Sequence, residues 1–121
     1  MVAALFDTNI LIDHLNAVPE AREEIALYDS RAISIVTWIE VMAGAKPHLV
    51  EPTRSFLRAF EIIGLDDEIA ARSVELRRDH RIRLPDAVIW ATAQIGRRLL
   101  VTRNVRDFPA DDPGIREPYR I

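Results

Sequence analysis

The sequence predicts an α/β domain of three layers, in which a central parallel sheet is covered by helices on both faces. Short apolar runs alternate along the chain with longer segments whose apolar residues recur every three or four positions. That alternation is typical of buried parallel strands joined by right-handed helical crossovers. The chain has 121 residues, of which 49% are hydrophobic and 29% charged, so we expect one folded domain over residues 1–121.

Composition excludes several classes of site. The chain has no cysteine, which rules out disulfides, zinc-thiolate sites and thiol nucleophiles and is typical of a reducing compartment. We therefore expect a cytoplasmic protein. The apolar run over residues 2–6 has no basic leader and is too short for a signal peptide, and no run is long enough to span a membrane.

The first elements are a strand and two helices. Residues 2–6 predict a strand that ends at the polar triplet Asp7-Thr8-Asn9. Apolar residues at helical spacing follow and predict a helix. Pro19, with acidic residues behind it, predicts a second helix that runs to about Asp29.

A second strand and two further helices follow. The β-branched run over residues 32–36 predicts the strand, and the next helix is predicted from Thr37 to Pro47. Its apolar residues are at helical spacing: Trp38, Val41, Met42 and Ala45. We expect Val41 and Met42 in the core. A further helix is predicted over residues 53–60, with Phe56, Leu57 and Phe60 on one face.

The last third predicts two helices and up to three strands. A weak strand over residues 62–65 precedes a helix over 66–80, which begins with three acidic residues. Its inner face is predicted from Ile69, Ala70, Ser73 and Val74. The helix over 85–95 is apolar nearly all round, which indicates burial inside the domain. A strand over 99–102 follows, and we expect a final edge strand near Tyr119.

Four acidic residues are predicted at the edge where ligands bind in such folds, outside the carboxyl ends of the strands. Asp7 ends the first strand, Glu40 lies one helical turn beyond the second, Asp86 opens the buried helix and Asp107 follows the fourth strand. Clustered carboxylates repel each other, and cations relieve that repulsion. Oxygen ligands select Mg²⁺ or Mn²⁺. A pair of such ions can hydrolyse a phosphodiester, which is the chemistry this pattern suggests.

Each acid also has a purely structural interpretation. Thr37 and Glu40 have the spacing of a helix capping box, and Asp86 follows Pro85 as a favourable first-turn acid. Asn104 is placed to cap a turn that contains Asp107. Asp7 could stabilise the start of the helix behind it. The three histidines, His14, His48 and His80, lie away from the acids, so we expect them at the surface.

Four segments resemble the motifs of PIN-domain proteins, in order and in register. They are LFDTNIL (5–11), IVTWIEV (35–41) followed by Gly44, LPDAVI (84–89) and LVTRNVRDF (100–108). More narrowly, they resemble VapC-type ribonuclease toxins. The resemblance implies a parallel sheet of order 3-2-1-4-5, Mg²⁺-dependent endoribonuclease activity on RNA, a homodimer, and inhibition by a VapB-type antitoxin whose tail occupies the active groove.

The resemblance also implies roles for individual residues. The metal-binding and catalytic carboxylates are Asp7, Glu40, Asp86 and Asp107. The polar residues that orient them are Thr8, Asn9, Thr102 and Asn104. An antitoxin arginine is expected among the first three acids, so that inhibition and metal binding compete. Trp90 stands where the family more often has a small residue, which bears on helix packing.

The net charge of −3, from 16 basic and 19 acidic residues, argues against RNA binding unless cations are bound. Two divalent ions would change −3 to +1. Arg103 and Arg106, beside the last motif, are then the best candidates for phosphate contacts. Arg77 and Arg78 are better explained as a solvated helix face.

Two other functional classes were weighed. A receiver-like phosphoacceptor domain needs paired acids after its first strand and a lysine after its fifth, whereas Lys46, the single lysine, lies between helices. A haloacid-dehalogenase-like phosphatase needs a second aspartate where Asn9 stands. A catalytically silent PIN-like domain that only binds RNA or a partner stays open as an alternative.

Overall fold

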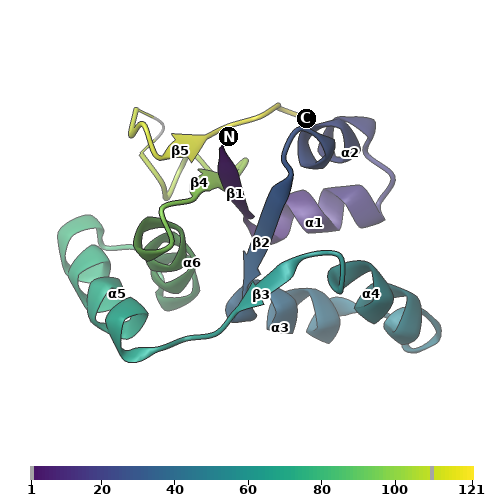
Figure 1. Cartoon of the computed structure of the whole chain (residues 1–121), viewed down its shortest axis with the longest axis horizontal. Coiled ribbons are helices and arrows are strands. Elements are labelled where there is room, and N and C mark those ends of the chain that lie inside the picture. The colour runs from purple at the N-terminus through teal and green to yellow at the C-terminus, as the bar shows by residue number, and fades with distance from the viewer. Residues whose placement is uncertain (1, 110) are drawn as a thin grey trace.

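The computed structural model describes residues 2–109 and 111–121 and shows a parallel sheet with helices on both faces (Figure 1). Its strands are β1 (Ala3–Phe6), β2 (Ser30–Ser34), β3 (Glu61–Ile63), β4 (Leu99–Val101) and β5 (Ile115–Arg116). Its helices are α1 (Thr8–Leu15), α2 (Pro19–Ala26), α3 (Ile35–Gly44), α4 (Val50–Leu57), α5 (Asp67–His80) and α6 (Leu84–Ile95), with a short 3₁₀ helix at Pro47–Leu49. The predicted three-layer α/β class is confirmed.

The sheet has the order β3-β2-β1-β4-β5 and all four pairings are parallel, as the resemblance implied. The central strand is β1, in which Leu5 lies opposite Ala32 of β2 and Leu100 of β4. The chain winds outward from β1 to β3 and then returns to the other side of β1. This reversal of direction opens a crevice at the carboxyl ends of β1 and β4, where ligands bind in folds of this kind.

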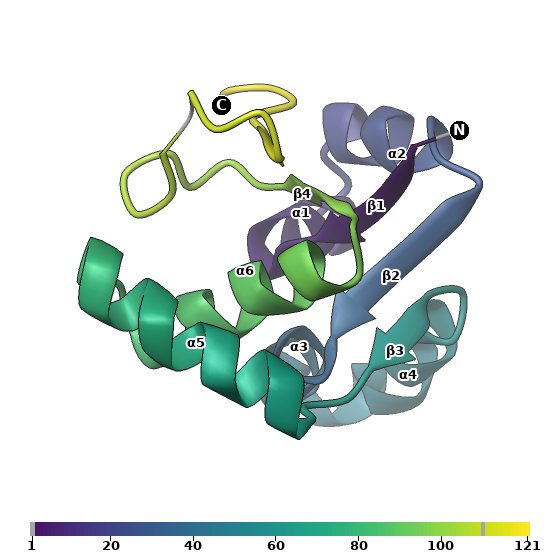
Figure 2. The same cartoon turned by 60° about the vertical axis from the view of Figure 1, so that its left-hand side comes forward.

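Alternate residues of the central strands enter two separate cores. Leu5 and Leu100 pack with α5 and α6, whereas Phe6 and Val101 pack with the helices of the opposite layer. Figure 2 shows α5 and α6 on one side of the sheet and α1 to α4 on the other. Because successive side chains of a strand point to opposite faces, a strand covered on both sides must be apolar throughout.

Helix α6 is enclosed between α5 and the sheet, as its apolar composition predicted. Every residue from 86 to 93 is buried. Trp90 is 2% exposed and its ring meets that of Phe108 edge to face, with centroids 5.8 Å apart. The large side chain at this position is thus accommodated against the segment that carries the last motif.

Several predicted boundaries are wrong. Strand β2 ends at Ser34, whose hydroxyl caps α3 by accepting from the Val36 N–H at 3.1 Å. Thr37 is consequently inside the helix and buried, so the proposed capping box of Thr37 and Glu40 does not exist. Helix α2 ends at Ala26, three residues earlier than expected.

The remaining differences concern α4, α5 and the last strand. Helix α4 begins and ends three residues earlier than predicted, although Leu57 and Phe60 are buried as expected. In α5 the buried residues are Ile69, Ser73 and Leu76, because the helix turns Ala70 and Val74 outward. The edge strand β5 forms at residues 115–116 instead of near Tyr119.

None of the helices in the described ranges is both long and apolar enough to cross a lipid bilayer.

Candidate functional site

Asp7 lies at the crevice between β1 and β4 and has hydrogen-bond donors on both carboxylate oxygens. Its Oδ1 accepts from the Thr8 N–H at 2.7 Å, which caps α1. Its Oδ2 accepts from the Thr102 hydroxyl at 2.7 Å and from the Asn9 amide at 3.1 Å. The Thr102 hydroxyl also accepts from the Asn104 N–H at 2.9 Å, so its single proton is directed to Asp7. Residues after two different strands thereby fix one carboxylate.

Asp7 carries an unfavourable charge. Burial raises its pKa to about 6, and the negative charges of Asp86 and Glu40 act in the same direction. Hydrogen bonds from Thr102 and Thr8 oppose the shift without cancelling it. A carboxylate that is 4% exposed and beside two other acids is ionised at a free-energy cost, which a cation would relieve.

Glu40 is held by a chain of hydroxyl groups. Its Oε1 accepts from the Thr8 hydroxyl at 2.6 Å, and the Thr37 hydroxyl lies 3.1 Å from that of Thr8. A carboxylate can only accept, so the proton of Thr8 points to Glu40 and Thr37 donates to Thr8. Thr37 and Glu40 share a face of α3, being three positions apart. The structure therefore links them through α1 instead of through a capping box.

Asp86, in the first turn of α6, has a buried oxygen without a hydrogen-bond partner. Among the described residues nothing bonds to its Oδ2. The closest cation is the Arg83 guanidinium, whose Nε lies 3.6 Å away. Burial raises the pKa of Asp86, the Arg83 charge opposes this, and Asp107 and Glu40 add to the rise. This carboxylate is both coupled to the other acids and incompletely satisfied.

Asp107 is fixed by Asn104 in a turn after β4. The Asn104 amide donates to Oδ2 of Asp107 at 2.9 Å, and the Asp107 N–H lies 3.3 Å from Oδ1 of Asn104, as the turn-capping interpretation expected. The neighbouring Phe108 is anchored on Trp90. Asp107 is half-buried at the same edge as the other acids.

The four acids interact electrostatically without converging on one point. Within residues 2–109 and 111–121, no three His, Cys, Asp or Glu side chains form a ready-made metal-binding group. Each carboxylate has its own partner. Asp7 is bonded to Thr102 and Glu40 to Thr8, whereas Asp86 lies beside Arg83 and Asp107 is bonded to Asn104. The donor set still fits a hard divalent cation, because all four acids offer oxygen and the Oδ2 atom of Asp86 is buried and unpartnered.

The two arginines predicted to contact phosphate differ in the structure. The Arg103 guanidinium forms a bidentate pair with buried Asp13, with Nη2 2.9 Å from Oδ1. Both arginines line, with Asn9 and Asn104, a cavity of about 370 Å³, but Arg106 is the exposed one. Arg106 is thus the better placed of the two.

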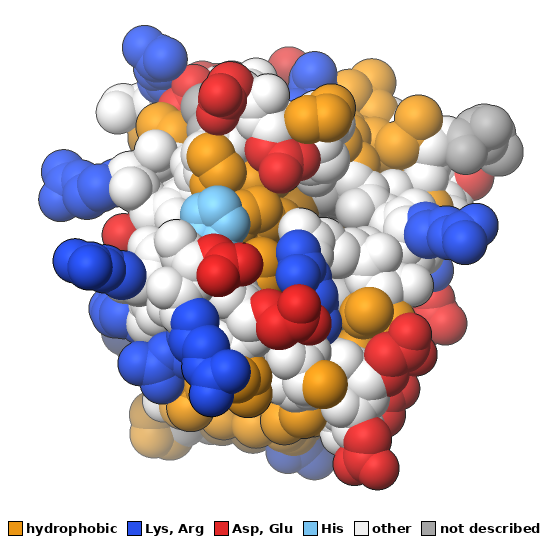
Figure 3. Space-filling model, turned by 90° about the vertical axis from the view of Figure 1, so that its left-hand side faces the viewer, with side chains coloured by type: hydrophobic (Ala, Val, Ile, Leu, Met, Phe, Trp, Pro, Cys, Tyr) orange, Lys and Arg blue, Asp and Glu red, His pale blue; other side chains and the backbone are white. Residues whose placement is uncertain are grey.

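On the face that α5 presents, Arg and Lys side chains gather mainly along one edge, with acidic side chains among them and beyond (Figure 3).

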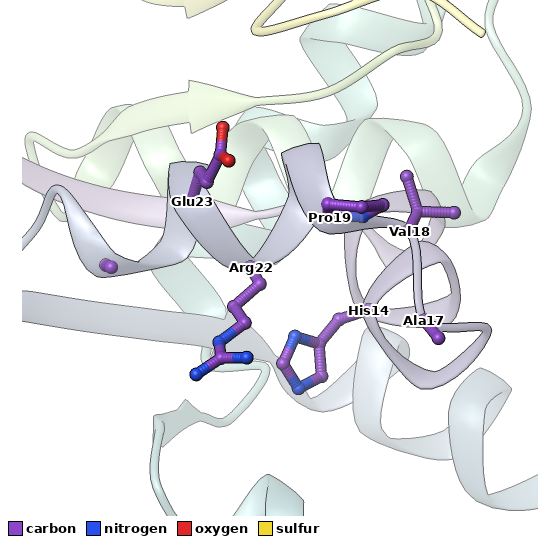
Figure 4. A pocket seen from close by; sticks show the side chains of 7 residues that line it. His14, Ala17, Val18, Pro19, Arg22 and Glu23 are labelled. Carbon is purple, nitrogen blue, oxygen red and sulfur yellow. The ribbon is translucent and has the colours of Figure 1, made fainter.

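Other hollows lie beside different residues. A cavity of about 610 Å³ is lined by His14, Arg22 and the turn between α1 and α2. In it His14 and Arg22 extend toward each other while Glu23 points to the other side of α2 (Figure 4). Burial and the charge of Arg22 lower the pKa of His14. This cavity holds none of the four predicted acids, so it is not the crevice at the strand ends.

Glu40 is one of the residues that line a groove of about 400 Å³. Apolar side chains that line it are Ile12, Leu15, Val41 and Leu49. Ile12, Leu15 and Leu49 are each more than 40% exposed, whereas Val41 is buried. The expected core position of Val41 is confirmed, whereas Met42, like Trp38, is half-buried and packs against the edge of the core.

Two residues of the site were missed by the sequence analysis. Thr37 was interpreted as a cap, yet its spacing from Glu40 already places both on one helix face. Asp13 gave no signal, because its partners Arg103 and Tyr119 are 90 and 106 positions away.

Comparisons with known proteins agree with this architecture. Residues 4–110 match the PIN domain family. The chain is 34% identical to "Ribonuclease VapC10" of Mycobacterium tuberculosis, covering 97% of this chain and 93% of the relative, and 32% identical to "Ribonuclease VapC19" of the same organism, covering 95% and 98%.

Solved structures agree as well. A "Toxin-antitoxin complex from Klebsiella pneumoniae" contains a chain that is 49% identical and superposes with a TM-score of 0.93, covering 98% of this chain and 100% of that one. A DNA-bound VapBC from Salmonella typhimurium is 26% identical with a TM-score of 0.76, covering 96% of each chain. With the family match over most of its length and full-length VapC relatives, this chain belongs to the PIN-domain family.

Proposed function

We propose that the protein is a metal-dependent endoribonuclease that hydrolyses RNA phosphodiester bonds, and the toxin of a type II toxin–antitoxin pair. The observation that carries this proposal is the position of buried Asp7, bonded to Thr102 between β1 and β4 and coupled electrostatically to Glu40 and Asp86. The VapC ribonucleases to which the chain is similar support the same activity.

The divalent ion, Mg²⁺ or Mn²⁺, would be held by Asp7, Glu40, Asp86 and Asp107. When bound, such an ion activates water and stabilises the developing charge of a phosphodiester. The chain's own part is to orient these ligands. Thr102 and Asn9 fix Asp7, Thr8 fixes Glu40, and Asn104 fixes Asp107.

Arg106 is proposed to hold a phosphate of the RNA. It is exposed beside the cavity that Asn9 and Asn104 also line, close in sequence to Asp107. A cation there supplies local positive charge where the substrate approaches, although the chain as a whole has a net charge of −3. Because this contact is to the sugar-phosphate backbone of the RNA, it contributes to affinity without selecting a nucleotide sequence.

Carboxylate-to-amide substitutions test the activity. Asp7→Asn, Glu40→Gln and Asp86→Asn are each expected to keep the fold and lose cleavage of single-stranded RNA in Mg²⁺ or Mn²⁺, because each amide preserves shape and removes charge. Asp79→Asn, at an exposed position of α5, is the matched control and should cleave normally. Normal cleavage by all three variants would overturn the catalytic assignment.

The same proteins distinguish the alternative of a catalytically silent domain. A wild-type chain that binds an antitoxin but neither binds Mn²⁺ by calorimetry nor cleaves RNA would be a partner-binding module only. Loss of Mn²⁺ binding in Asp86→Asn, together with loss of cleavage, is the result that we expect.

The proposed partner is a VapB-type antitoxin whose apolar side chains enter the groove of Ile12, Leu15 and Leu49. Glu40, which also lines this groove, would accept an arginine of the same segment. The chain's 49% identity to a protein solved as a toxin–antitoxin complex supports a partner of this kind.

Competition with metal tests this mode of inhibition. The antitoxin of the Klebsiella pneumoniae complex is the probe, added stoichiometrically to a nuclease assay at rising Mg²⁺. Inhibition should weaken as Mg²⁺ rises. Leu15→Glu should weaken it further, whereas Leu65→Glu, exposed before α5, should not. Inhibition that is unaffected by Mg²⁺ and by alanine substitution of the antitoxin's arginines would show that the antitoxin only covers the groove.

We also propose a homodimer, as the family resemblance implies. Sedimentation equilibrium should then give twice the 13.8 kDa of one chain. A mass that stays at 13.8 kDa across micromolar concentrations would contradict it.

A further inference from the structure

Two buried carboxylates outside the acidic set each bind an arginine that is distant in sequence and a tyrosine. Asp13 of α1 is 5% exposed and forms the bidentate pair with Arg103, while the Tyr119 hydroxyl donates to its Oδ2 at 2.7 Å. We name these three residues the Asp13 clamp. Since one carboxylate accepts from both, the clamp joins α1, the segment after β4 and the end of the chain.

A second cluster has the same chemistry. Glu24 of α2 is 4% exposed and pairs with Arg116 through contacts of 2.7 and 2.9 Å. The Tyr28 hydroxyl donates to Glu24 Oε2 at 2.7 Å. We name this the Glu24 clamp. Arg116 belongs to β5, and its backbone carbonyl accepts from the Thr102 N–H at 3.0 Å beside the β4–β5 pairing, so the sheet holds this contact when side chains of the Glu24 clamp change.

The Asp13 clamp reaches Asp7 through Arg103, which lies after β4 and outside the strand pairings, so the position of its backbone depends on how its side chain is held. The backbone N–H of Arg103 donates to Oδ1 of Asn9 at 3.1 Å. This fixes which end of the Asn9 amide faces the site, because Oδ1 is engaged and Nδ2 must point the other way. Nδ2 then donates to Asp7 Oδ2 at 3.1 Å and lies 3.3 Å from the Thr102 hydroxyl. If the Asn9 amide were rotated, its Oδ1 would face the Asp7 carboxylate, and two acceptor oxygens without a proton between them repel each other.

We propose that the Asp13 clamp positions the Asp7 carboxylate for metal binding, with Arg103 and Tyr119 acting as positioning residues through Asn9. The proposal rests on the proposed metal-dependent activity. It assigns Arg103 a role in orienting the site in place of a phosphate contact. It also makes the last residues of the chain, through Tyr119, a support of the catalytic geometry.

The two tyrosines provide a matched pair of variants. Tyr119→Phe and Tyr28→Phe each remove one hydroxyl from a buried carboxylate, but only the first weakens the link to Asn9. Arg103→Lys keeps the positive charge and loses the bidentate geometry, so it separates positioning from simple attraction of phosphate. If Arg103→Lys fails to fold, Tyr119→Phe still carries the test, because it deletes a single oxygen.

Three measurements follow the effect of these variants from the Asn9 amide to metal binding and RNA cleavage. The first is the side-chain amide resonance of Asn9 in ¹⁵N-labelled protein, the second is the Mn²⁺ dissociation constant by calorimetry, and the third is kcat and KM for RNA cleavage. Groups that orient metal ligands typically change metal affinity or activity by 10- to 100-fold. Because the clamp is one contact further out, we expect about 3- to 10-fold weaker Mn²⁺ binding and lower kcat, with KM little changed.

The control decides the outcome. Tyr28→Phe should lower the melting temperature about as much as Tyr119→Phe while leaving the Asn9 resonance, Mn²⁺ affinity and kcat at wild-type values. If Tyr119→Phe and Arg103→Lys behave like Tyr28→Phe in all three readouts, the clamp is only structural and the proposal is wrong. A larger change in KM than in kcat for Arg103→Lys would return that residue to phosphate binding.

Failure of the proposed function has a different signature. In that case wild-type protein neither binds Mn²⁺ nor cleaves RNA, whereas the Asn9 resonance still reports whether the clamp sets the amide. A shifted Asn9 resonance in Tyr119→Phe and an unshifted one in Tyr28→Phe would support the positioning role by itself. Unshifted resonances in both would overturn it.

Discussion

The Thr102 hydroxyl and the Asp7 carboxylate, each the first residue after a strand, are joined by a 2.7 Å hydrogen bond across the β1–β4 pairing. Their backbones are also linked, because the Asp7 N–H donates to the carbonyl of Val101 at 2.9 Å. The geometry of the most buried of the four predicted site acids is thus set by the parallel register of two strands that are far apart in sequence.

Asp7→Asn should stabilise the protein at neutral pH in the absence of divalent ions. The pKa of Asp7 is raised from 3.8 to about 6, so the folded state disfavours its ionised form. Each pKa unit corresponds to about 1.4 kcal/mol, which gives roughly 2 to 3 kcal/mol in favour of the variant above pH 6. Urea unfolding in EDTA at pH 8 and pH 4 measures this.

The stability difference between the wild-type protein and Asp7→Asn should change with pH in one defined direction. A carboxyl group with a raised folded-state pKa costs stability only when ionised, so the wild-type deficit should develop between about pH 4 and pH 6. Below pH 4 the wild-type protein and Asp7→Asn should be equally stable. A deficit that is constant from pH 4 to pH 8 would show that the substitution acts through packing.

Thr102→Val should raise the pKa of Asp7 further and lower the free energy of unfolding. The change removes a hydroxyl that donates to a buried carboxylate, and leaving such a group short of a donor costs about 1 to 3 kcal/mol. Thr102→Ser, which keeps the hydroxyl, is the control. ¹³C NMR titration of the Asp7 carboxyl compares the three proteins, and identical titrations in all would contradict the assignment.

Ser34→Ala should destabilise α3 by about 1 kcal/mol, because the Ser34 hydroxyl accepts from the Val36 N–H at the start of that helix. Thr37→Ser retains the hydroxyl near Thr8 and should change stability less. Guanidinium unfolding of both variants tests where the helix is capped. An unfolding free energy that Ser34→Ala leaves unchanged would contradict the cap at Ser34.

Glu24→Gln should destabilise the protein at pH 7 by roughly 2 kcal/mol, because it removes the charge that binds Arg116. Burial alone would raise the pKa of Glu24, but hydrogen bonds from Arg116 and Tyr28 lower it below its ordinary value of 4.5. The ionised Glu24 carboxylate therefore contributes its full stabilisation above pH 4.5, and this contribution is lost as the pH falls through the lowered folded-state pKa. Thermal unfolding from pH 7 to pH 3 should show the two proteins converging in acid.

Mn²⁺ should raise the melting temperature in a concentration-dependent way, as ligand linkage requires for an ion that binds only the folded state. The rise should be larger at pH 8 than at pH 5, where Asp7 is largely protonated. Asp86→Asn should abolish most of it. A melting temperature that is unchanged by millimolar Mn²⁺ in both proteins would argue against a metal site.

Most of the fold could be predicted because it depends on local pattern. The apolar run before Asp7 and the all-round apolar helix after Pro85 have few alternatives to burial. The β2–α3 boundary was misplaced because Ile35 and Val36 are β-branched and resemble strand residues. The cap at Ser34 outweighs that preference.

Local sequence pattern could not predict the position of β5 or the partner of Arg103. Ile115 becomes a strand residue by pairing with Leu100, and the aromatic residue expected in that strand, Tyr119, bonds to Asp13 instead. Both outcomes depend on contacts across most of the chain. The four acids influence one another electrostatically, but their separate hydrogen bonds follow from side-chain geometry that spacing does not encode.

The two outer strands are very short, β3 having three residues and β5 only two. Exposed strand edges are templates on which further chains assemble into aggregates. Here Gly64 follows β3 at once, and Pro118, which lacks an N–H, lies two residues beyond β5. Neither edge can therefore offer a long ladder of free backbone groups. Pairing between the sheet edges of two chains is therefore disfavoured.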